Sequence, residues 1–187
     1  MKIDYRAAEK NDFAAVMEIA ETELNSGLEY DEYMRGIFDK LGNGAEGVLA
    51  LDAEKLVGFA FVEEGMALSG DRTDFFDEIK ADINGDKIWT GAATAVLPEY
   101  MNFKIGAALY IFTLSRLEDI GAKHLLLEIW VRPDGYMPSD PHLRIARDYT
   151  EYGVVKNFYH DASLKGYICP VCGKDCKCMA KIAVVHI

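Results

Sequence analysis

Four cysteines near the end of the chain have the clearest potential for chemistry. They are the chain's 4 cysteines, and they read Cys169-Pro-Val-Cys172-Gly-Lys-Asp-Cys176-Lys-Cys178. A disulfide scaffold would spread its cysteines along the chain to join distant loops, whereas this spacing brings thiolates onto one cation. Four thiolates fill a tetrahedral zinc shell and leave no open position, so Cys169, Cys172, Cys176 and Cys178 predict a structural zinc site. An iron–sulfur centre, free thiols and a redox disulfide are the alternatives.

A second candidate is the run Ala95–Leu109, where a strand turns into a helix that begins with small side chains. Backbone N–H groups at the start of a helix, together with the positive end of the helix dipole, can bind a diphosphate without charged side chains. Gly106, Ala107 and Ala108 would let that anion approach the backbone closely. The run lacks the glycines and the Lys-Ser/Thr pair of a Walker loop or a dinucleotide fingerprint. A strand–helix junction whose glycine merely relieves packing is the alternative.

This run resembles the GNAT superfamily of acyl-CoA N-acyltransferases. In that family a central strand ends in Val-x-Pro-Glu-Tyr, followed by an Arg/Gln-x-x-Gly-x-Gly/Ala loop and a helix. The positions that match are Val96, Pro98, Glu99, Tyr100, Ile105, Gly106, Ala108 and Leu109. Met101 stands where the family has Arg or Gln, and Lys104 stands where it has its first glycine. These two departures concern the affinity for CoA rather than the fold.

The resemblance covers essentially the whole chain and implies an α/β fold. We expect a GNAT-type mixed, mostly antiparallel twisted sheet flanked by helices, forming one domain over 1–187, with a four-cysteine metal-binding hairpin within 165–187. The resemblance also implies acetyl-CoA as cosubstrate and, from the family alone, a homodimer. The residues that it implies in cofactor binding are Ala95, Val96, Met101, Asn102, Phe103, Lys104, Ile105, Gly106 and Ala107.

A catalytic acid is the next requirement, because the departing thiolate needs a proton. In the family this acid is usually the Tyr of Phe-Tyr-Glu-Lys-x-Gly-Phe, and the segment Phe158–Tyr167 resembles that motif with Tyr159 in the acid position. Tyr149 is a rival, because Tyr149-Thr-Glu-Tyr-Gly153 keeps the spacing from Tyr to Gly. We favour Tyr159, since the strand that should follow is expected to begin at Lys165. A packed aromatic side chain is the alternative for either tyrosine.

A catalytic base is suggested by Glu128, which lies in the apolar run His124–Val131. A carboxylate among Leu, Ile and Trp is costly unless it is paired or protonated, so Glu128 is either functional or held by a structural hydrogen bond. Glu99 and His160 are weaker candidates. A chain of water molecules, as in many enzymes of the family, would make a dedicated base unnecessary.

Composition limits the partners. The 187 residues include 31 acidic and 20 basic side chains, which gives a formal net charge of −11. Such a chain repels phosphate backbones, which excludes general nucleic-acid binding, and attracts cations such as an amine substrate. No secretory signal follows the first residues, and no run of about 18 apolar residues occurs, so we expect a soluble cytoplasmic protein without membrane contact.

Strands and helices must position these candidates, and the hydrophobic pattern predicts where they lie. Strands are expected over Lys2–Ala7, Gly47–Leu51, Leu56–Val62, Lys87–Leu97 and His124–Val131, and as two strands around the cysteines within Tyr167–Val185. Helices are expected from an Asp12 N-cap to Leu24, over Tyr30–Leu41, Phe75–Ala81 and Gly106–Ile120, and from Asp140-Pro141 to Tyr152 or Ala162. The buried face of the fourth helix is expected to comprise Ile105, Ala108, Leu109, Phe112, Leu117 and Ile120.

The sequence therefore predicts an N-acetyltransferase that transfers an acetyl group from acetyl-CoA to a primary amine by direct attack, with Tyr159 as acid and Glu128 as base. The acceptor stays open among small amines, polyamines, antibiotics and peptide termini. The alternative function is an interaction or regulatory protein that keeps the fold and a zinc hairpin but has lost catalysis through Met101 and Lys104.

Overall fold

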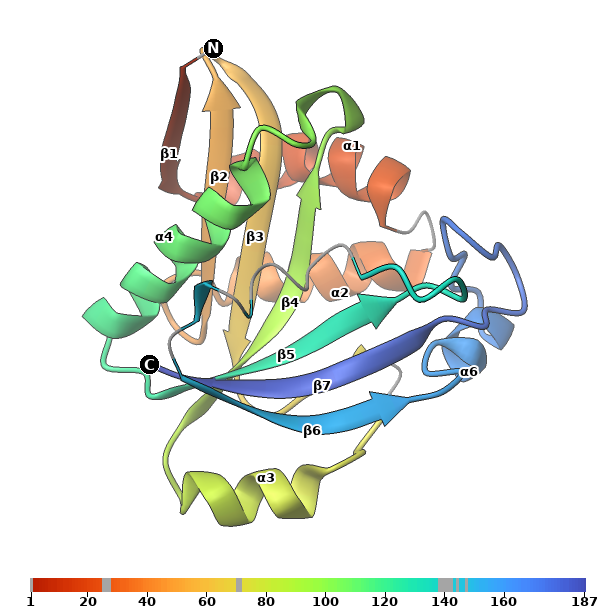
Figure 1. The fold of residues 1–187 in the computed structure, drawn as a ribbon. Coiled ribbons are helices and arrows are strands. Elements are labelled where there is room, and N and C mark those ends of the chain that lie inside the picture. Colours follow the sequence, from red (N-terminus) through yellow and green to blue (C-terminus); the bar gives the residue numbers. More distant parts are fainter. Residues whose placement is uncertain (1, 25–27, 70–71, 138–142, 144, 147) are drawn as a thin grey trace. The chain divides into compact units, whose positions relative to one another are not determined.

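The structure is a computed structural model that describes residues 2–24, 28–69, 72–137, 143, 145, 146 and 148–187. It contains a seven-stranded mixed sheet with strand order β1-β2-β3-β4-β5-β7-β6, flanked by helices (Figure 1). The strands are β1 (Ile3–Ala7), β2 (Ala45–Asp52), β3 (Lys55–Glu64), β4 (Ile88–Val96), β5 (His124–Val131), β6 (Tyr149–Val155) and β7 (Met179–His186). The α-helices are α1 (Phe13–Glu23), α2 (Leu28–Asp39), α3 (Phe76–Ile83), α4 (Ile105–Asp119) and α6 (His160–Leu164), and short 3-10 turns are η1 (Lys10–Asp12) and η3 (Pro98–Tyr100). The expected mixed α/β fold is confirmed.

The chain forms two compact units, and β4 and α4 each contribute to both. The first unit comprises residues 1–63 and 92–116, and the second comprises residues 64–91 and 117–187. Each unit has its own hydrophobic core.

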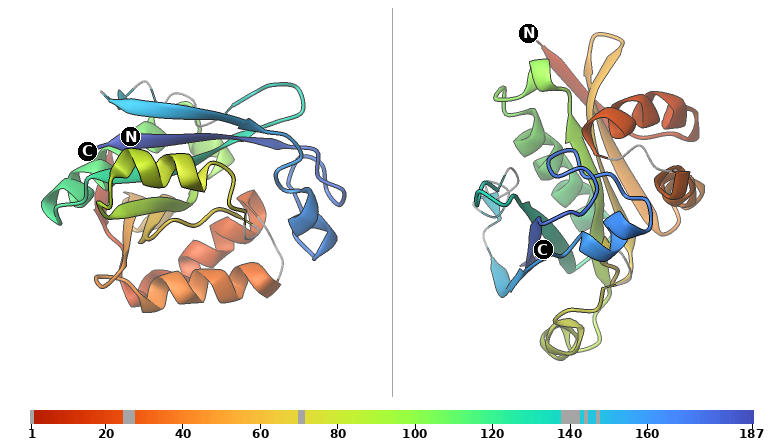
Figure 2. Two further views of the ribbon diagram at one scale, coloured as in Figure 1. Left: turned by 90° about the horizontal axis from the view of Figure 1, so that it is seen from below. Right: turned by 90° about the vertical axis from the view of Figure 1, so that its right-hand side faces the viewer.

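In the first unit, the sheet has apolar side chains on both faces, because successive residues of a strand point to opposite sides. Leu49 and Phe59 pack with α1 and α2 on one face. Val48 and Ala50 pack with Ile105 of α4 on the other face. Figure 2 shows α1 and α2 on one side of these strands and α4 on the opposite side. The unit therefore fixes α4 against the strands that precede it in sequence.

Two expectations about the first unit are wrong in detail. Asp12 makes no side-chain cap to α1; its carboxylate accepts two hydrogen bonds from Arg6, each of 2.7 Å, and one from the Glu9 N–H. The helix α4 is present as expected, but Phe112 and Ile120 are 45% and 48% exposed rather than buried. Phe112 instead stacks on Tyr5, with the ring centroids 4.8 Å apart.

In the second unit, β5 pairs antiparallel with β7, and β7 pairs antiparallel with β6. The start of β4 pairs in parallel with β5, from Ile88 opposite His124 to Thr90 opposite Leu126. One face of these strands is covered by α3, whose Ile79 and Ile83 join the same core as the cysteines.

The largest correction concerns the segment after β5. Residues from Tyr149 to Val155 form strand β6 rather than a helix, and the helix that follows is short, over His160–Leu164. The expected start at Asp140-Pro141 lies outside the described residues. In the described stretch 148–187, no strand begins at Lys165; the cysteines lie in the connection between α6 and β7. The cluster thus belongs to the long connection of the β6–β7 hairpin.

Replacing Asp12 by Asn is expected to lower the free energy of unfolding at pH 7 by about 0.5–1 kcal/mol, since the Arg6 pair is partly exposed. The hydrogen bonds from Arg6 hold the pKa of the Asp12 carboxyl below its usual range. The stabilisation is therefore present above a pH of about 4 and is lost as the pH falls through the lowered pKa. Urea unfolding of both proteins at pH 7 and pH 3 measures this; an equal difference at both pH values would contradict it.

Candidate functional site

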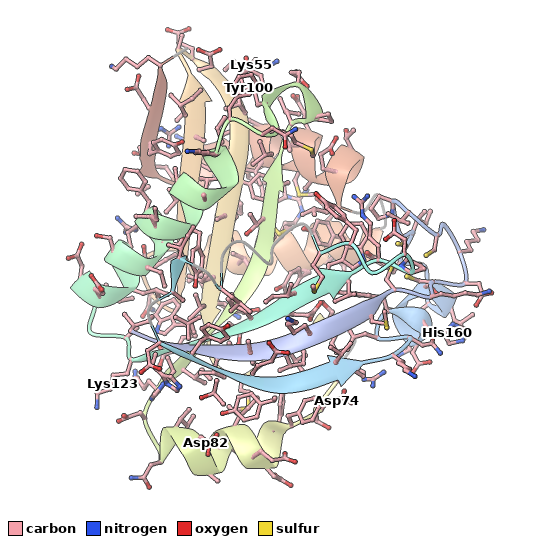
Figure 3. All side chains as sticks on the ribbon, in the orientation of Figure 1. Lys55, Asp74, Asp82, Tyr100, Lys123 and His160 are labelled. Carbon is pink, nitrogen blue, oxygen red and sulfur yellow. The ribbon has the colours of Figure 1, made fainter. Side chains whose placement is uncertain are left out.

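The turn between β4 and α4 is held by contacts on each side of it. The Leu97 N–H donates to the Val57 carbonyl at 2.9 Å, and the Tyr100 hydroxyl donates to Asp52 at 3.0 Å. Lys55 pairs with Glu99 at 3.0 Å and lies over the Tyr100 ring, beside which Figure 3 labels it. The backbone N–H of Glu99 and the Lys55 side chain both donate hydrogen bonds to the Glu99 carboxylate, and they lower its pKa. Glu99 is therefore a weak base, engaged in fixing the turn.

The start of α4 presents backbone donors. Asn102 and Lys104 both adopt the left-handed conformation, with φ of 67° and 64°, and the Ala108 N–H makes the bond to the Lys104 carbonyl. The amides before Ala108, from Ile105 to Ala107, are those that an α-helix leaves without an intrahelical acceptor. Lys104 thus occupies a backbone conformation that glycine adopts more readily than lysine, at the position where the family resemblance places its first glycine.

The predicted cofactor-binding residues lie at the end of β4, in the turn and at the start of α4, a region that we call the β4–α4 corner. Their side chains differ in exposure. Ala95 and Ile105 are buried, and Val96, Gly106 and Ala107 are half-buried. Met101, Asn102, Phe103 and Lys104 are exposed. The exposed residues form the turn, whereas the buried ones join it to the strand and the helix.

Gly58 of β3 supports this corner, although the motifs did not identify it. A Cβ atom at Gly58 would lie 2.9 Å from the Ala95 carbonyl oxygen and 3.1 Å from a Val96 methyl group. The register between β2 and β3 is irregular at the same place, between Ala50 and Leu51. A lone glycine inside a strand pattern is the available sequence signal for such a close approach of two backbones.

The second unit brings the predicted acid and base together. The Tyr159 hydroxyl donates a hydrogen bond to the Glu128 carboxylate, which also accepts the Ser69 N–H at 2.9 Å. Tyr159 is 8% exposed and stacks on Tyr167 with ring centroids 5.9 Å apart. Sequence reasoning did not identify Ser69 or Tyr167 as parts of this arrangement, because both contacts depend on the fold.

Burial sets the protonation of this pair. Desolvation raises the pKa of the half-buried Glu128 carboxyl, and the donors Tyr159 and Ser69 offset part of that rise. Burial and the nearby Glu128 charge raise the pKa of Tyr159 well above its usual value. Tyr159 therefore carries its proton at neutral pH, and Glu128 is a carboxyl with raised proton affinity. The two groups can exchange a proton through one hydrogen bond.

The rival candidates lie elsewhere in the same unit. Tyr149 is 43% exposed and lies at the start of strand β6 rather than on a helix. The preference for Tyr159 assumed a strand that begins at Lys165, and no such strand forms in the described stretch 148–187. The hydrogen bond from Tyr159 to Glu128 now distinguishes the two tyrosines. His160 pairs with Asp175 at 3.2 Å.

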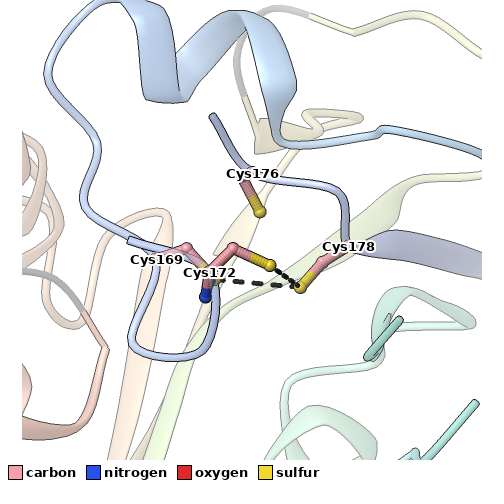
Figure 4. Close-up of side chains that lie close together, drawn as sticks. All are labelled: Cys169, Cys172, Cys176 and Cys178. Carbon is pink, nitrogen blue, oxygen red and sulfur yellow. Dashed lines mark hydrogen bonds between the residues drawn. The ribbon is translucent and has the colours of Figure 1, made fainter. Parts of the chain in front are cut away.

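The four cysteine side chains converge on one point (Figure 4). All four sulfur atoms lie within 4.8 Å of one another, with Cys178 at 3.8 Å from Cys169 and 3.5 Å from Cys172. Four sulfurs that each lie about 2.3 Å from one zinc ion would stand about 3.8 Å apart. The N–H groups of Val171 and Cys172 donate to the Cys169 sulfur at 3.4 Å. The donor set therefore fits a tetrahedral metal ion.

Without a cation, burial opposes ionisation of two of the four thiols, Cys176 and Cys178. Burial raises the pKa of Cys176 to about 12. Burial also raises the pKa of Cys178, and the nearby Trp130 indole offsets part of that rise. For Cys172, hydrogen bonds from the Lys177 N–H and the other thiols outweigh burial and lower the pKa. A bound divalent ion would supply the charge that keeps all four sulfurs deprotonated.

No protein-family model and no curated protein sequence matches the chain. Solved structures match its whole length at low identity. They include an acetyltransferase of the GNAT family from Desulfovibrio desulfuricans (15% identity, 99% of each chain, TM-score 0.63). Arabidopsis thaliana NAA60 in complex with acetyl-CoA is 15% identical over 100% of this chain and 99% of that chain, with a TM-score of 0.69. The mosquito protein named arylalkylamine N-acetyltransferase like 5b is 14% identical over 100% of each chain, with a TM-score of 0.70.

These matches show that the chain has the GNAT fold, and the resemblance drawn from the Val96–Leu109 run is confirmed at that level. Among the residues that the structure describes, every helix is too short or too polar to cross a membrane.

Replacing Gly58 by Ala is expected to lower the free energy of unfolding by about 1–3 kcal/mol, because the new methyl group meets the Ala95 carbonyl. The displaced end of β4 should also weaken acetyl-CoA binding. Urea unfolding and calorimetric titration with acetyl-CoA measure the two effects. Gly36→Ala is the matched control, since a Cβ there has nothing within 4 Å. Equal stability and affinity in the Gly58 and Gly36 variants would show that the close approach is unimportant.

Proposed function

We propose that the protein is an N-acetyltransferase that transfers the acetyl group of acetyl-CoA to a primary amine by direct attack. The observation that carries this proposal is the conformation at the start of α4. Asn102 and Lys104, in the left-handed conformation, precede this helix, and the first backbone amides of the helix lack intrahelical acceptors. The GNAT fold over the whole chain and the acetyl-CoA bound to one protein of that fold support it.

The acyl donor is assigned to the first unit. The amides from Ile105 to Ala107 would bind the diphosphate of CoA, and small side chains at Gly106 and Ala107 would let it approach. Backbone groups of Ala95 and Val96 would pair with the pantetheine, as the family resemblance implies, and an N–H near Val96 would stabilise the oxyanion. Lys104, beside this turn, could add a charge for a phosphate.

Proton transfer is assigned to the Tyr159–Glu128 pair. The amine nitrogen attacks the thioester carbonyl, and the resulting tetrahedral adduct collapses with cleavage of the carbon–sulfur bond. Glu128 takes the proton that the amine loses, Tyr159 gives its proton to the departing thiolate, and Glu128 returns a proton to Tyr159. The hydrogen bond between the two residues carries this last transfer. The chain's 4 cysteines all lie in the Cys169–Cys178 cluster, which leaves no separate thiol for an acyl-enzyme intermediate.

The acceptor is proposed to be an amine that is an ammonium ion in solution and that loses one proton to solvent before its neutral nitrogen attacks. The formal charge of −11 attracts ammonium groups, and one protein of similar fold is a Drosophila melanogaster polyamine N-acetyltransferase that forms N-acetylagmatine. A screen of tyramine, agmatine, spermidine and an alanine-initiated peptide, read by release of the CoA thiol, would identify the class.

The four cysteines are proposed to hold one structural zinc ion, since their spacing matches a tetrathiolate shell and leaves no position for water. This assignment is independent of the acetyl-CoA corner, which lies in the other unit.

Tyr159→Phe is expected to lower kcat about 100-fold, within the range typical of a general acid. The dissociation constant for acetyl-CoA, measured by calorimetric titration, should not change, because the assigned donor-binding residues are in the first unit. Tyr149→Phe is the matched control and should keep the wild-type kcat. Full activity in Tyr159→Phe would reject its role. Absence of heat with wild-type protein and millimolar acetyl-CoA would instead favour the interaction protein that Met101 and Lys104 suggest.

Metal analysis of the purified protein is expected to find about one zinc per chain, and Cys176→Ser should lose it. Removal of zinc with a chelator should lower the midpoint of thermal unfolding, because the metal joins parts of a loop that has little regular structure. Iron in place of zinc would indicate an iron centre, and a metal-free protein with an unchanged midpoint would contradict a structural metal.

A further inference from the structure

The loop that carries the cysteines is joined by its backbone to the segment that carries Tyr159. The Phe158 N–H donates to the Cys178 carbonyl at 3.0 Å. The Cys176 N–H donates to the Ser163 hydroxyl at 3.0 Å, and that hydroxyl donates to the His160 carbonyl at 2.7 Å. Two of the four sulfur-bearing residues therefore hold the chain immediately before and after Tyr159. Figure 1 shows α6 beside this loop.

Side chains add to the same connection. Tyr167, which stacks on Tyr159, lies just before Cys169 in the sequence, and its N–H donates to the Ala162 carbonyl at 3.0 Å. Asp175 in the loop pairs with His160 at 3.2 Å. A residue just before the cysteine loop thus stacks on the ring of Tyr159, and a residue within the loop pairs with the neighbouring His160.

Neither partner in this connection is stable alone. A helix of five residues, as α6 is, is well below the length at which isolated helices form. The cysteine loop has one isolated bridge, Cys169 to Gly173, as its regular pairing within the described stretch 165–178. Convergence of four sulfurs on a cation is the interaction that would fix the loop.

We propose that the metal-bound cysteine loop positions the Tyr159–Glu128 pair, and that Ser163 is the residue that transmits this positioning. Ser163 is 5% exposed, and its one hydroxyl both accepts from the loop and donates to the helix. Loss of the metal would release Cys176 and Cys178, and with them the backbone on each side of Tyr159. The consequence for catalysis rests on the acetyltransferase proposal; the structural coupling does not.

The structural coupling can be tested by amide hydrogen exchange followed by NMR. Removal of zinc with a chelator is expected to increase exchange of the Phe158 and Cys176 amides at least tenfold, with the amides of Leu49 and Phe59 in the first unit unchanged. Trp130 offers a second measurement. In a Trp89→Phe background it is the chain's remaining tryptophan, and its fluorescence emission should change because its side chain packs against the core cluster that contains Cys178. Unchanged exchange at Phe158 would overturn the proposal, as would an equal increase in both units.

The role of Ser163 is tested with the metal in place. Ser163→Ala is expected to keep its zinc and the KM for acetyl-CoA, to exchange the Cys176 and Phe158 amides faster, and to lower kcat about tenfold. Ser163→Thr restores a hydroxyl and should restore both exchange and kcat. Ser115→Ala, at an exposed position of α4, is the control for loss of a serine.

Equal loss of kcat in Ser163→Ala and Ser163→Thr would show that packing rather than the hydroxyl matters, and would overturn the assignment. If the wild-type protein acetylates no amine of the panel, the acetyltransferase proposal fails. Exchange at Phe158 and Cys176 in zinc-loaded Ser163→Ala then decides the coupling by itself, with faster exchange supporting it and unchanged exchange rejecting it.

Discussion

The reversal of the chain between β4 and α4 is the constraint on which the first unit depends. Two residues with side chains, Asn102 and Lys104, adopt a left-handed conformation there, at a cost of about 1 kcal/mol or more each. Burial of the Ile105 and Leu109 side chains, at about 1.5–3 kcal/mol each, offsets that cost. The packing of α4 onto β2 and β3 therefore keeps the turn in a conformation that its own residues do not favour.

The same packing gives the turn its chemical character. The salt bridge between Arg116 and Glu46 joins the far end of α4 to β2 within the first unit. Under the proposed function, the first amides of α4 bind an external anion, and in a protein with a net charge of −11 an anion needs a local reason to approach. A helix N-terminus with small side chains supplies that reason without a basic patch.

Local patterns were sufficient to predict most elements that position the candidate site. The hairpin of β2 and β3, the strands β4 and β5 and the helix α4 follow from alternation, periodicity and turn residues, all of which act over a few positions. The convergence of the cysteines was also predictable, because their spacing restricts the geometry directly. The presence of β6 was not: Tyr149–Val155 alternates exposed with half-buried residues, and its identity as a strand comes from pairing with β7.

Contacts between distant segments account for the remaining differences. Asp12 has the side chain of a good N-cap, yet the bidentate pair with Arg6 uses both of its oxygens. The neighbours of Glu128 come from a loop at Ser69 and from Tyr159 beyond β6, and no spacing rule joins three such segments. The sequence could therefore nominate Glu128 and Tyr159 separately, from burial cost and motif, but only the fold could show that they share a hydrogen bond.

That contact imposes a requirement on the segment after β6. A hydrogen bond between a buried phenol and a carboxyl is sensitive to small displacements, because its strength falls steeply when distance and angle depart from the optimum. Tyr159 lies directly before a five-residue helix, which cannot hold its own geometry. Rigid support must therefore come from a neighbouring segment, and backbone hydrogen bonds from Phe158 and Cys176 join this segment to the loop that carries the four converging sulfur atoms. Under the zinc proposal, a metal ion bound by these sulfur atoms would supply rigidity where the chain has too little regular structure to do so.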